Sequence, residues 1–167
     1  MYIGIICEFD PLHSGHARLL SHARAMGADA VICAMSGNFT QRGSFAALDK
    51  RARAEMAVRC GADLVVELPT VWAMSPAETF ARGGVQLLAL TGVDTLLFGS
   101  ECGEIEILET IAETLIDPLI GADIRAELQN DAGIPFAVAR QRAVAKRLGE
   151  MSSQLETPNN ILAIEYI

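Results

Sequence analysis

The sequence is poor in aromatic residues and has no apolar run long enough to cross a membrane. Aromatic residues make up 5% of its 167 residues, whereas hydrophobic residues make up 51%. A core this aliphatic is typical of a parallel sheet sandwiched between helices. The chain is long enough to bury such a core within one domain, and its composition argues against a protein anchored in a membrane.

Positive charge is also scarce, because the formal net charge is −8 at pH 7. This balance argues against the chain alone being a strong nucleic-acid binder. Nine of its thirteen lysines and arginines nevertheless fall in two segments, so the acidic total can conceal local basic patches. These residues are Arg42, Lys50, Arg51, Arg53 and Arg59 in the first segment, and Arg140, Arg142, Lys146 and Arg147 in the second.

The four cysteines lack CxxC spacing, and no third ligand follows the first two histidines at a spacing typical of zinc sites. We therefore predict buried, reduced thiols and no zinc site. The sequence begins directly on an apolar strand, without the basic segment and cleavage site of a secretory leader. We expect a cytoplasmic protein. The cysteines are Cys7, Cys33, Cys60 and Cys102.

What the first part of the chain does contain is a regular alternation of strand-length apolar runs and helical segments. This alternation predicts parallel βαβ units and hence a doubly wound, Rossmann-like α/β sheet. We expect Ser75 to cap the third helix and Pro76 to occupy its first position. The predicted strands span residues 2–7, 30–35, 62–69 and 93–99, and the predicted helices span 15–26, 50–60 and 75–92.

The second part of the chain has a helical pattern throughout. We predict a nucleotide-binding core over residues 1–103 and a helical extension of the same domain over residues 104–167. The last helical pattern runs to Ile167 without a capping residue, so we expect the chain to continue in a longer protein. The predicted helices span residues 105–116, 122–128 and 135–148, and one more begins at 157.

The polar loops of the first part all follow predicted strands. In doubly wound sheets, ligands bind beyond the carboxyl ends of the strands. The loops should therefore gather at one edge and form a single composite site. They span residues 10–15, 36–43, 68–75 and 99–103.

The first strand-to-helix junction concentrates the candidate residues. The chain breaks at Asp10-Pro11 and restarts as a helix near Gly15, with His13 and His16 beside the helix start. Unpaired N–H groups and the helix dipole favour an anion there, and a glycine lets it approach the backbone. The pattern predicts a phosphate site, and the rival interpretation is an ordinary solvated helix start.

Several motifs together resemble one enzyme family. Residues 4–16 read GIICEFDPLHSGH, which resembles the opening of the HxGH nucleotidyltransferase superfamily. Four further stretches make the chain similar to the tRNA(Met) cytidine acetate ligase family. The family usually has Asn where this chain has Asp10, which adds a negative charge near the expected phosphates. The four stretches are SGNFTQRG at 36–43, ADLVVELP at 62–69, FGSE at 98–101 and PNNIL at 158–162.

The resemblance implies an ATP-dependent ligase that modifies tRNA. Acetate would attack the α-phosphate of ATP to give acetyl-adenylate and pyrophosphate. The acetyl group would then pass to N4 of the wobble cytidine of elongator tRNA(Met). ATP and Mg²⁺ are the implied cofactors, and acetate and tRNA are the implied partners. Two alternatives stay open: an adenylyltransferase that makes a nucleotide cofactor, and a non-catalytic nucleotide- or RNA-binding module.

The predicted catalytic residues are His13, His16 and Lys50. The two imidazoles would donate to phosphate oxygens and stabilise the charge that develops as pyrophosphate leaves. Lys50 begins a predicted helix, where a cation needs an anionic partner such as a phosphate, Asp49 or Glu55. The segment with Arg140 and its neighbours would be a solvated helix face in a stand-alone domain and an RNA-facing surface in the full ligase.

The remaining candidates are predicted to bind ATP, the substrate or a metal. Glu8 and Glu67 follow or end strands, and either could hold Mg²⁺ or a basic neighbour. Asn38, Gln41 and Arg42 are predicted to contact acetate, nucleotide or RNA. The predicted ATP-binding residues are Ile6, Cys7, Glu8, Phe9, Asp10, Pro11, His13, Gly15, His16, Gly99, Ser100, Asn159 and Asn160.

Overall fold

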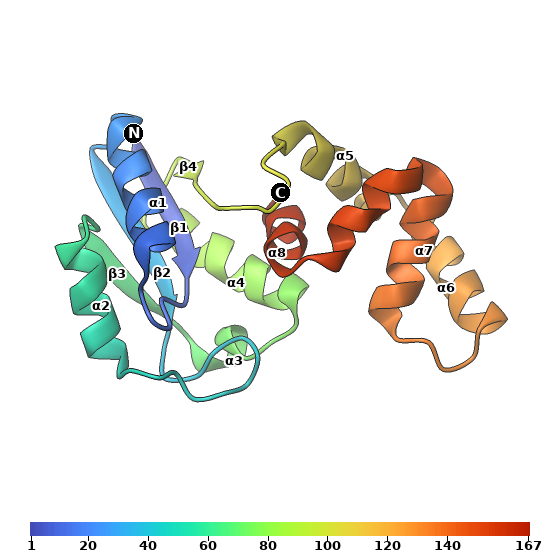
Figure 1. The fold of residues 1–167 in the computed structure, drawn as a ribbon, viewed down its shortest axis with the longest axis horizontal. Helices are drawn as coiled ribbons and strands as arrows, with labels where there is room; N and C mark the ends of the chain where they lie inside the picture. Colours follow the sequence, from blue (N-terminus) through green and yellow to red (C-terminus); the bar gives the residue numbers. More distant parts are fainter. The chain divides into compact units, whose positions relative to one another are not determined.

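A four-stranded parallel sheet forms the centre of residues 1–98 in the computed structural model, which describes residues 1–167 (Figure 1). The strand order is β3-β2-β1-β4, so the direction of winding reverses beside β1. This order confirms the predicted Rossmann-like sheet and places its switch point at the carboxyl end of β1. The strands are β1 (Tyr2–Cys7), β2 (Ala30–Ser36), β3 (Leu64–Leu68) and β4 (Thr95–Leu96).

Helices cover both faces of this sheet. Leu20 of α1 and Ala57 of α2 pack with Ile5 and Cys33 in one buried cluster. On the opposite face, Leu88 of α4 packs with buried strand residues of β2. The sheet therefore has the aliphatic core on both sides that its composition predicted. The helices of this unit are α1 (Ser14–Ala25), α2 (Lys50–Arg59), α3 (Thr70–Ala73) and α4 (Ala77–Leu90).

Two glycines let α4 approach its neighbours closely. A Cβ added to Gly84 would lie 2.7 Å from Ile6 Cδ1, and one added to Gly83 would lie 2.6 Å from the ring of Trp72. Real Cβ atoms do not come this close to a packed side chain, so both positions exclude larger residues. The helix is thereby held against β1 and α3.

Several local predictions were wrong. Ser75 does not cap α4, because its hydroxyl donates to the carbonyl of Trp72 at 2.6 Å and Pro76 occupies the cap position. The short helix α3 was not predicted. The predicted fourth strand, 93–99, is reduced to two residues that pair with β1.

Residues 99–167 form a second compact unit that is entirely helical. The predicted helices are present, and a 3₁₀-helix that was not predicted precedes the last one. The buried side chains are small or aliphatic, such as Ile111, Ile124 and Val144. No helix of the chain combines the length and apolarity needed to span a membrane. The elements are α5 (Ile105–Ile116), α6 (Ile120–Asn130), α7 (Phe136–Leu148), η1 (Gly149–Glu156) and α8 (Pro158–Tyr166).

The chain packs into units of residues 1–98 and 99–167. The prediction that residues 104–167 extend the same folding domain as residues 1–103 stays a prediction, because packing units do not show which segments fold together.

Candidate functional site

The first turn of α1 is organised by two stacked histidines. His13 is the N-cap, and its Nδ1 accepts a hydrogen bond from the backbone N–H of Gly15 at 3.1 Å. His16 Nδ1 accepts from the backbone N–H of His13 at 3.3 Å, which completes a reciprocal capping box. The two rings stack with their centroids 3.7 Å apart. The chain thus uses imidazoles where helices usually begin with a hydroxyl or carboxylate.

These hydrogen bonds determine which ring nitrogens carry protons. An imidazole nitrogen that accepts a hydrogen bond carries no proton, so in both neutral rings the proton sits on Nε2. Burial, and next the charge of His13, lower the pKa of His16. The edge contact with Phe9, at 5.0 Å between ring centroids, contributes to that burial. In the neutral form of each ring, the helix start therefore presents an Nε2–H donor.

The loop before these histidines is held in an uncommon backbone conformation. Phe9 has φ of 51°, a left-handed value that is rare outside glycine, and its side chain is buried. The Asp10–Pro11 peptide is cis. The carboxylate of Asp10 accepts from the backbone N–H of Ala47 at 2.6 Å. Within the chain, its negative charge is therefore met by a backbone N–H group and not by a cation.

Glu8 ties the loop after β2 to the loop between β1 and α1. The Glu8 carboxylate accepts from the backbone N–H of Gln41 at 2.5 Å and from the Ser36 hydroxyl at 3.4 Å. The Gln41 side chain donates to the carbonyl of Ser75. Asn38 accepts from the backbone N–H of Lys50 at 3.0 Å. Glu8, Asn38 and Gln41 therefore build this edge of the sheet through bonds within the chain.

Arg53 holds three segments of the site together from within. Its side chain is fully buried, and the guanidinium donates to the carbonyls of Glu8, Gly37 and Leu48. None of the ion pairs in the chain involves Arg53. The sequence showed Arg53 only as a member of a basic segment. Its position after the Asp49–Lys50 helix start gave no signal that the side chain turns inward.

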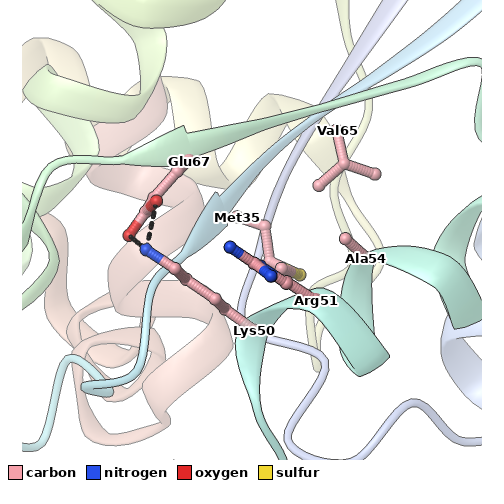
Figure 2. A pocket seen from close by; sticks show the side chains of 6 residues that line it. All are labelled: Met35, Lys50, Arg51, Ala54, Val65 and Glu67. Carbon is pink, nitrogen blue, oxygen red and sulfur yellow. Dashed lines mark hydrogen bonds and ion pairs between the residues drawn. The ribbon is translucent and has the colours of Figure 1, made fainter.

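Lys50 pairs with Glu67, and this pair borders a pocket (Figure 2). Lys50 Nζ lies 2.7 Å from both carboxylate oxygens of Glu67. The predicted partners of Lys50, Asp49 and Glu55, were wrong, since Asp49 caps the backbone of α2 and Glu55 pairs with Arg59. The pocket has a volume of about 340 Å³. It is lined by Met35, Lys50, Arg51, Ala54, Val65 and Glu67.

The asparagine pair at the start of α8 has a structural role within residues 99–167. Asn160 is 1% exposed, and its side-chain oxygen accepts from the backbone N–H groups of Glu101 and Cys102. Its amide donates to Gln154. Asn160 thus has its hydrogen bonds satisfied within the chain, whereas Asn159 is exposed and donates to Glu101. Of the two predicted ATP contacts, Asn159 is the one with a reachable side chain.

Glu101 closes the amino end of α8. Its two carboxylate oxygens accept from the backbone N–H groups of Asn159 at 3.1 Å and Asn160 at 2.7 Å. Desolvation of the carboxyl acts to raise its pKa, but hydrogen bonds, first among them these two, outweigh it and hold the pKa of Glu101 below its ordinary value. Nearby, Ser100 Oγ accepts from the backbone N–H of Gly103, and Gly99 is exposed.

The other predicted contacts differ in accessibility. Ile6 is half-buried against α4, whereas Pro11 and Arg42 are exposed. Cys7 is buried, its thiol donates to the carbonyl of Ala34, and burial together with Cys33 raises the thiol pKa. A ligand can reach Cys7 only through its backbone. The prediction that all four cysteines are buried was wrong, because Cys60 is exposed and Cys102 is half-buried.

The basic segment of α7 is neutralised by acidic side chains of the same helical unit. Arg142 pairs with Asp131 at 2.8 Å, and Arg147 pairs with Asp117 and Asp123. Arg140 pairs with Glu165, and Lys146 pairs with Glu127. Each basic residue of this segment therefore already has a partner within the helical unit.

The chain contains no cluster of three or more His, Cys, Asp or Glu side chains that could hold a metal ion. Mg²⁺ is commonly bound through one or two carboxylates together with phosphate oxygens. Glu8 and Asp10 are the acidic residues beside the α1 start, and both carboxylates accept hydrogen bonds from backbone N–H groups. They fit an ion brought in by a triphosphate better than an ion held by protein ligands alone.

Comparisons with known proteins agree with this geometry. The family model for the HIGH nucleotidyl transferases matches residues 1–167. Curated tRNA(Met) cytidine acetate ligases of Clostridium perfringens and Caldanaerobacter subterraneus are 44% and 45% identical over 98% and 99% of this chain. The chain covers 43% and 42% of those two proteins.

A solved structure also matches. The crystal structure of Thermotoga maritima TmcAL bound with alpha-thio ATP has a TM-score of 0.93 and 40% identity, over 99% of this chain and 42% of that one. The chain thus spans about two fifths of the length of the relatives it matches. The similarity to tRNA(Met) cytidine acetate ligases predicted from the motifs is confirmed. With its paired histidines at the first crossover and a family model that matches from end to end, the chain belongs to the HIGH nucleotidyl transferase family.

Proposed function

We propose that this chain is the nucleotide-binding part of a cytoplasmic tRNA(Met) cytidine acetate ligase. The full-length protein would join acetate to the α-phosphate of ATP and release pyrophosphate. It would then transfer the acetyl group to N4 of the wobble cytidine of elongator tRNA(Met). The names of the curated relatives and the alpha-thio ATP in the Thermotoga maritima protein support this proposal.

The paired imidazoles at α1 carry the proposal for ATP. Both rings accept through Nδ1, so both can donate Nε2–H to phosphate oxygens. The backbone N–H group of Ser14 is left for the same anion, because the capping box uses those of His13, Gly15 and His16. These donors can stabilise the charge that moves onto pyrophosphate as acetate attacks.

The chain needs few other groups for this first step. Acetate is already ionised at neutral pH, so its attack requires no general base. Lys50 is proposed as a further cation on the same edge of the sheet, held in place by Glu67. Mg²⁺ would enter with the triphosphate and neutralise part of its charge. Asn159 and the exposed turn at Gly99 are proposed as further ATP contacts.

The test is acetate-dependent exchange of labelled pyrophosphate into ATP by the full-length protein. We expect exchange in the wild type and a loss of about 10²–10³-fold in the double variant His13→Ala/His16→Ala, because both donors are removed. His22→Ala is the matched control, because His22 is exposed near the other end of α1. It should retain exchange. Circular dichroism would show that α1 and the fold persist in each variant.

Two results would contradict the proposal. Adenylyl transfer to a phosphorylated acceptor without acetate would identify a cofactor adenylyltransferase. Binding of ATP without exchange under any substrate would identify a non-catalytic module.

A further inference from the structure

We infer that the pocket between α2 and β3 receives the acceptor cytosine and that Glu67 takes a proton from its N4 amine. This inference rests on the proposed ligase function and adds a base-binding pocket and a catalytic residue for the second step.

The pocket opens at the edge of the sheet where the phosphate site lies. Glu67 is the second-to-last residue of β3, and its Oε1 would lie 2.5 Å from a Cβ placed on Gly37. Gly37 begins the loop that reaches Glu8 through Gln41. Because adjacent strands lie about 4.8 Å apart, β3 is about 10 Å from β1 across this edge. An acetyl-adenylate bound at α1 can therefore reach a base bound beside β3.

The pocket has walls suited to a planar base. Its apolar part is formed by Met35, Ala54 and Val65, and its charged part by Lys50, Arg51 and Glu67 (Figure 2). Its volume of about 340 Å³ lies within the range of small-ligand sites. Enzymes that modify a nucleobase usually turn it out of the stack into such a pocket.

The charged groups match the hydrogen-bonding pattern of cytosine. A carboxylate accepts through about four lone-pair positions, and Lys50 occupies one on each oxygen of Glu67. The remaining positions can accept from the N4 amine, which is the pairing that acidic residues make with cytosine. Arg51 has no ion pair in the chain, so its guanidinium is available to the O2 and N3 acceptors of the base. Uracil would turn its O4 acceptor toward the Glu67 carboxylate and be repelled.

The proposed step balances as an acyl transfer. N4 attacks the carbonyl carbon of acetyl-adenylate, and a new C–N bond forms. The bond from that carbon to the phosphate oxygen breaks, and AMP leaves with its electron pair. N4 loses one proton to the Glu67 carboxylate, which then releases it to water. Lys50 fixes the Glu67 carboxylate in position before the step.

The experiment separates the two half-reactions in the full-length protein. In Glu67→Gln, we expect acetyl transfer to a tRNA(Met) transcript to fall at least about 100-fold, as for loss of a general base. Acetate-dependent pyrophosphate exchange should fall by far less, no more than about threefold, because the carbonyl oxygen of the glutamine side chain can still accept from Lys50 Nζ and hold it in place. Glu67→Asp, which keeps the charge, should recover part of the transfer. Glu55→Gln is the matched control, because Glu55 is also an exposed partner of a basic residue and lies on the outer face of α2.

A second readout tests base recognition. A transcript with uridine at the wobble position should inhibit the wild type weakly and Glu67→Gln more strongly, because glutamine can donate to O4. Equal losses of exchange and transfer in Glu67→Gln, with unchanged discrimination against uridine, would show that Glu67 only positions Lys50 and would overturn the inference. Absence of exchange in the wild type would instead overturn the proposed function.

Discussion

At the scale of single residues, Arg53 shows how a buried charge can be held by backbone groups alone. Its guanidinium donates to carbonyls of three segments and lacks an acidic partner. Arg53→Met should lower the free energy of unfolding by roughly 3–5 kcal/mol, because the buried carbonyl of Gly37 and the partly buried carbonyls of Glu8 and Leu48 lose their donor. Urea denaturation followed by circular dichroism measures this change.

Arg53→Lys is the sharper comparison. An ammonium cannot reach three carbonyls with the planar geometry of a guanidinium, so this variant should also be clearly destabilised. Arg51→Lys, an exposed neighbour on the same helix, should change stability by less than about 0.5 kcal/mol. Equal stability of Arg53→Lys and the wild type would contradict the proposed bracing role.

His16 makes stability depend on pH. Its pKa is lowered in the folded protein, so the unfolded chain binds more protons in the range below the ordinary histidine value of 6.5. The stability contributed by neutral His16 should be fully present above pH 6.5 and decrease as the pH falls through the lowered pKa. Urea denaturation between pH 5 and pH 7.5 should show this slope, and His16→Asn should flatten it. His22→Asn should leave the slope unchanged.

At the scale of the elements, most of the fold could be predicted because the hydrophobic pattern and the positions of glycines indicate the same element boundaries. The run of aliphatic residues marks β1, the glycine after α1 marks the end of that helix, and Asp49–Lys50 marks the start of α2. The structure confirms each of these boundaries. The length of the fourth strand could not be predicted, because it depends on how many residues of the chain pair with β1. Ser75 looked like a cap, but it bonds backward to Trp72.

The part of the site that was predictable consists of residues that lie close together in the sequence. The histidine pair lies within one turn, so its spacing in the sequence reflects its geometry. The Lys50–Glu67 pair and the contacts of Arg53 with Glu8 and Gly37 join residues 16 to 45 positions apart, and the sequence alone does not show such contacts. Asn160 was predicted to bind ATP from a motif, and in the structure its side chain joins α8 to the turn at Glu101 and Cys102, before α5.

The contact of α4 with β1 gives a prediction about helix packing. Alanine in place of glycine usually stabilises a helix interior by about 1 kcal/mol. Gly84→Ala should instead destabilise the protein by about 1–3 kcal/mol, because its Cβ would meet Ile6 at 2.7 Å. Gly121→Ala is the control, since its Cβ would be at an ordinary 3.5 Å from Arg125, and it should not destabilise. Thermal unfolding followed by circular dichroism compares the two variants.

At the scale of the whole molecule, some basic residues form ion pairs within the chain and others do not. The basic residues of α7 have carboxylate partners, whereas exposed Arg42 has no ion pair. In the full-length protein, Arg142→Gln should change tRNA affinity less than about twofold and leave its salt dependence unchanged. Arg42→Gln should weaken binding and reduce the salt slope by about one.

Fluorescence anisotropy with labelled tRNA between about 50 and 200 mM salt measures both slopes. Over this range, a protein that makes about six to ten phosphate contacts loses much of its affinity. A reduced slope for Arg142→Gln would show that its pair with Asp131 opens on binding, contrary to this prediction.

The helix starts of this protein differ in what faces their positive ends. The backbone of α2 is met by the carboxylate of Asp49, and that of α8 by the carboxylate of Glu101. At α1 the first turn is met by the Nδ1 atoms of two imidazoles and by no carboxylate, so the positive end of this helix has no anionic partner in the chain. We therefore expect sulfate and phosphate buffers to compete with nucleotide at α1. Measurements of nucleotide affinity on this protein call for chloride or organic buffers.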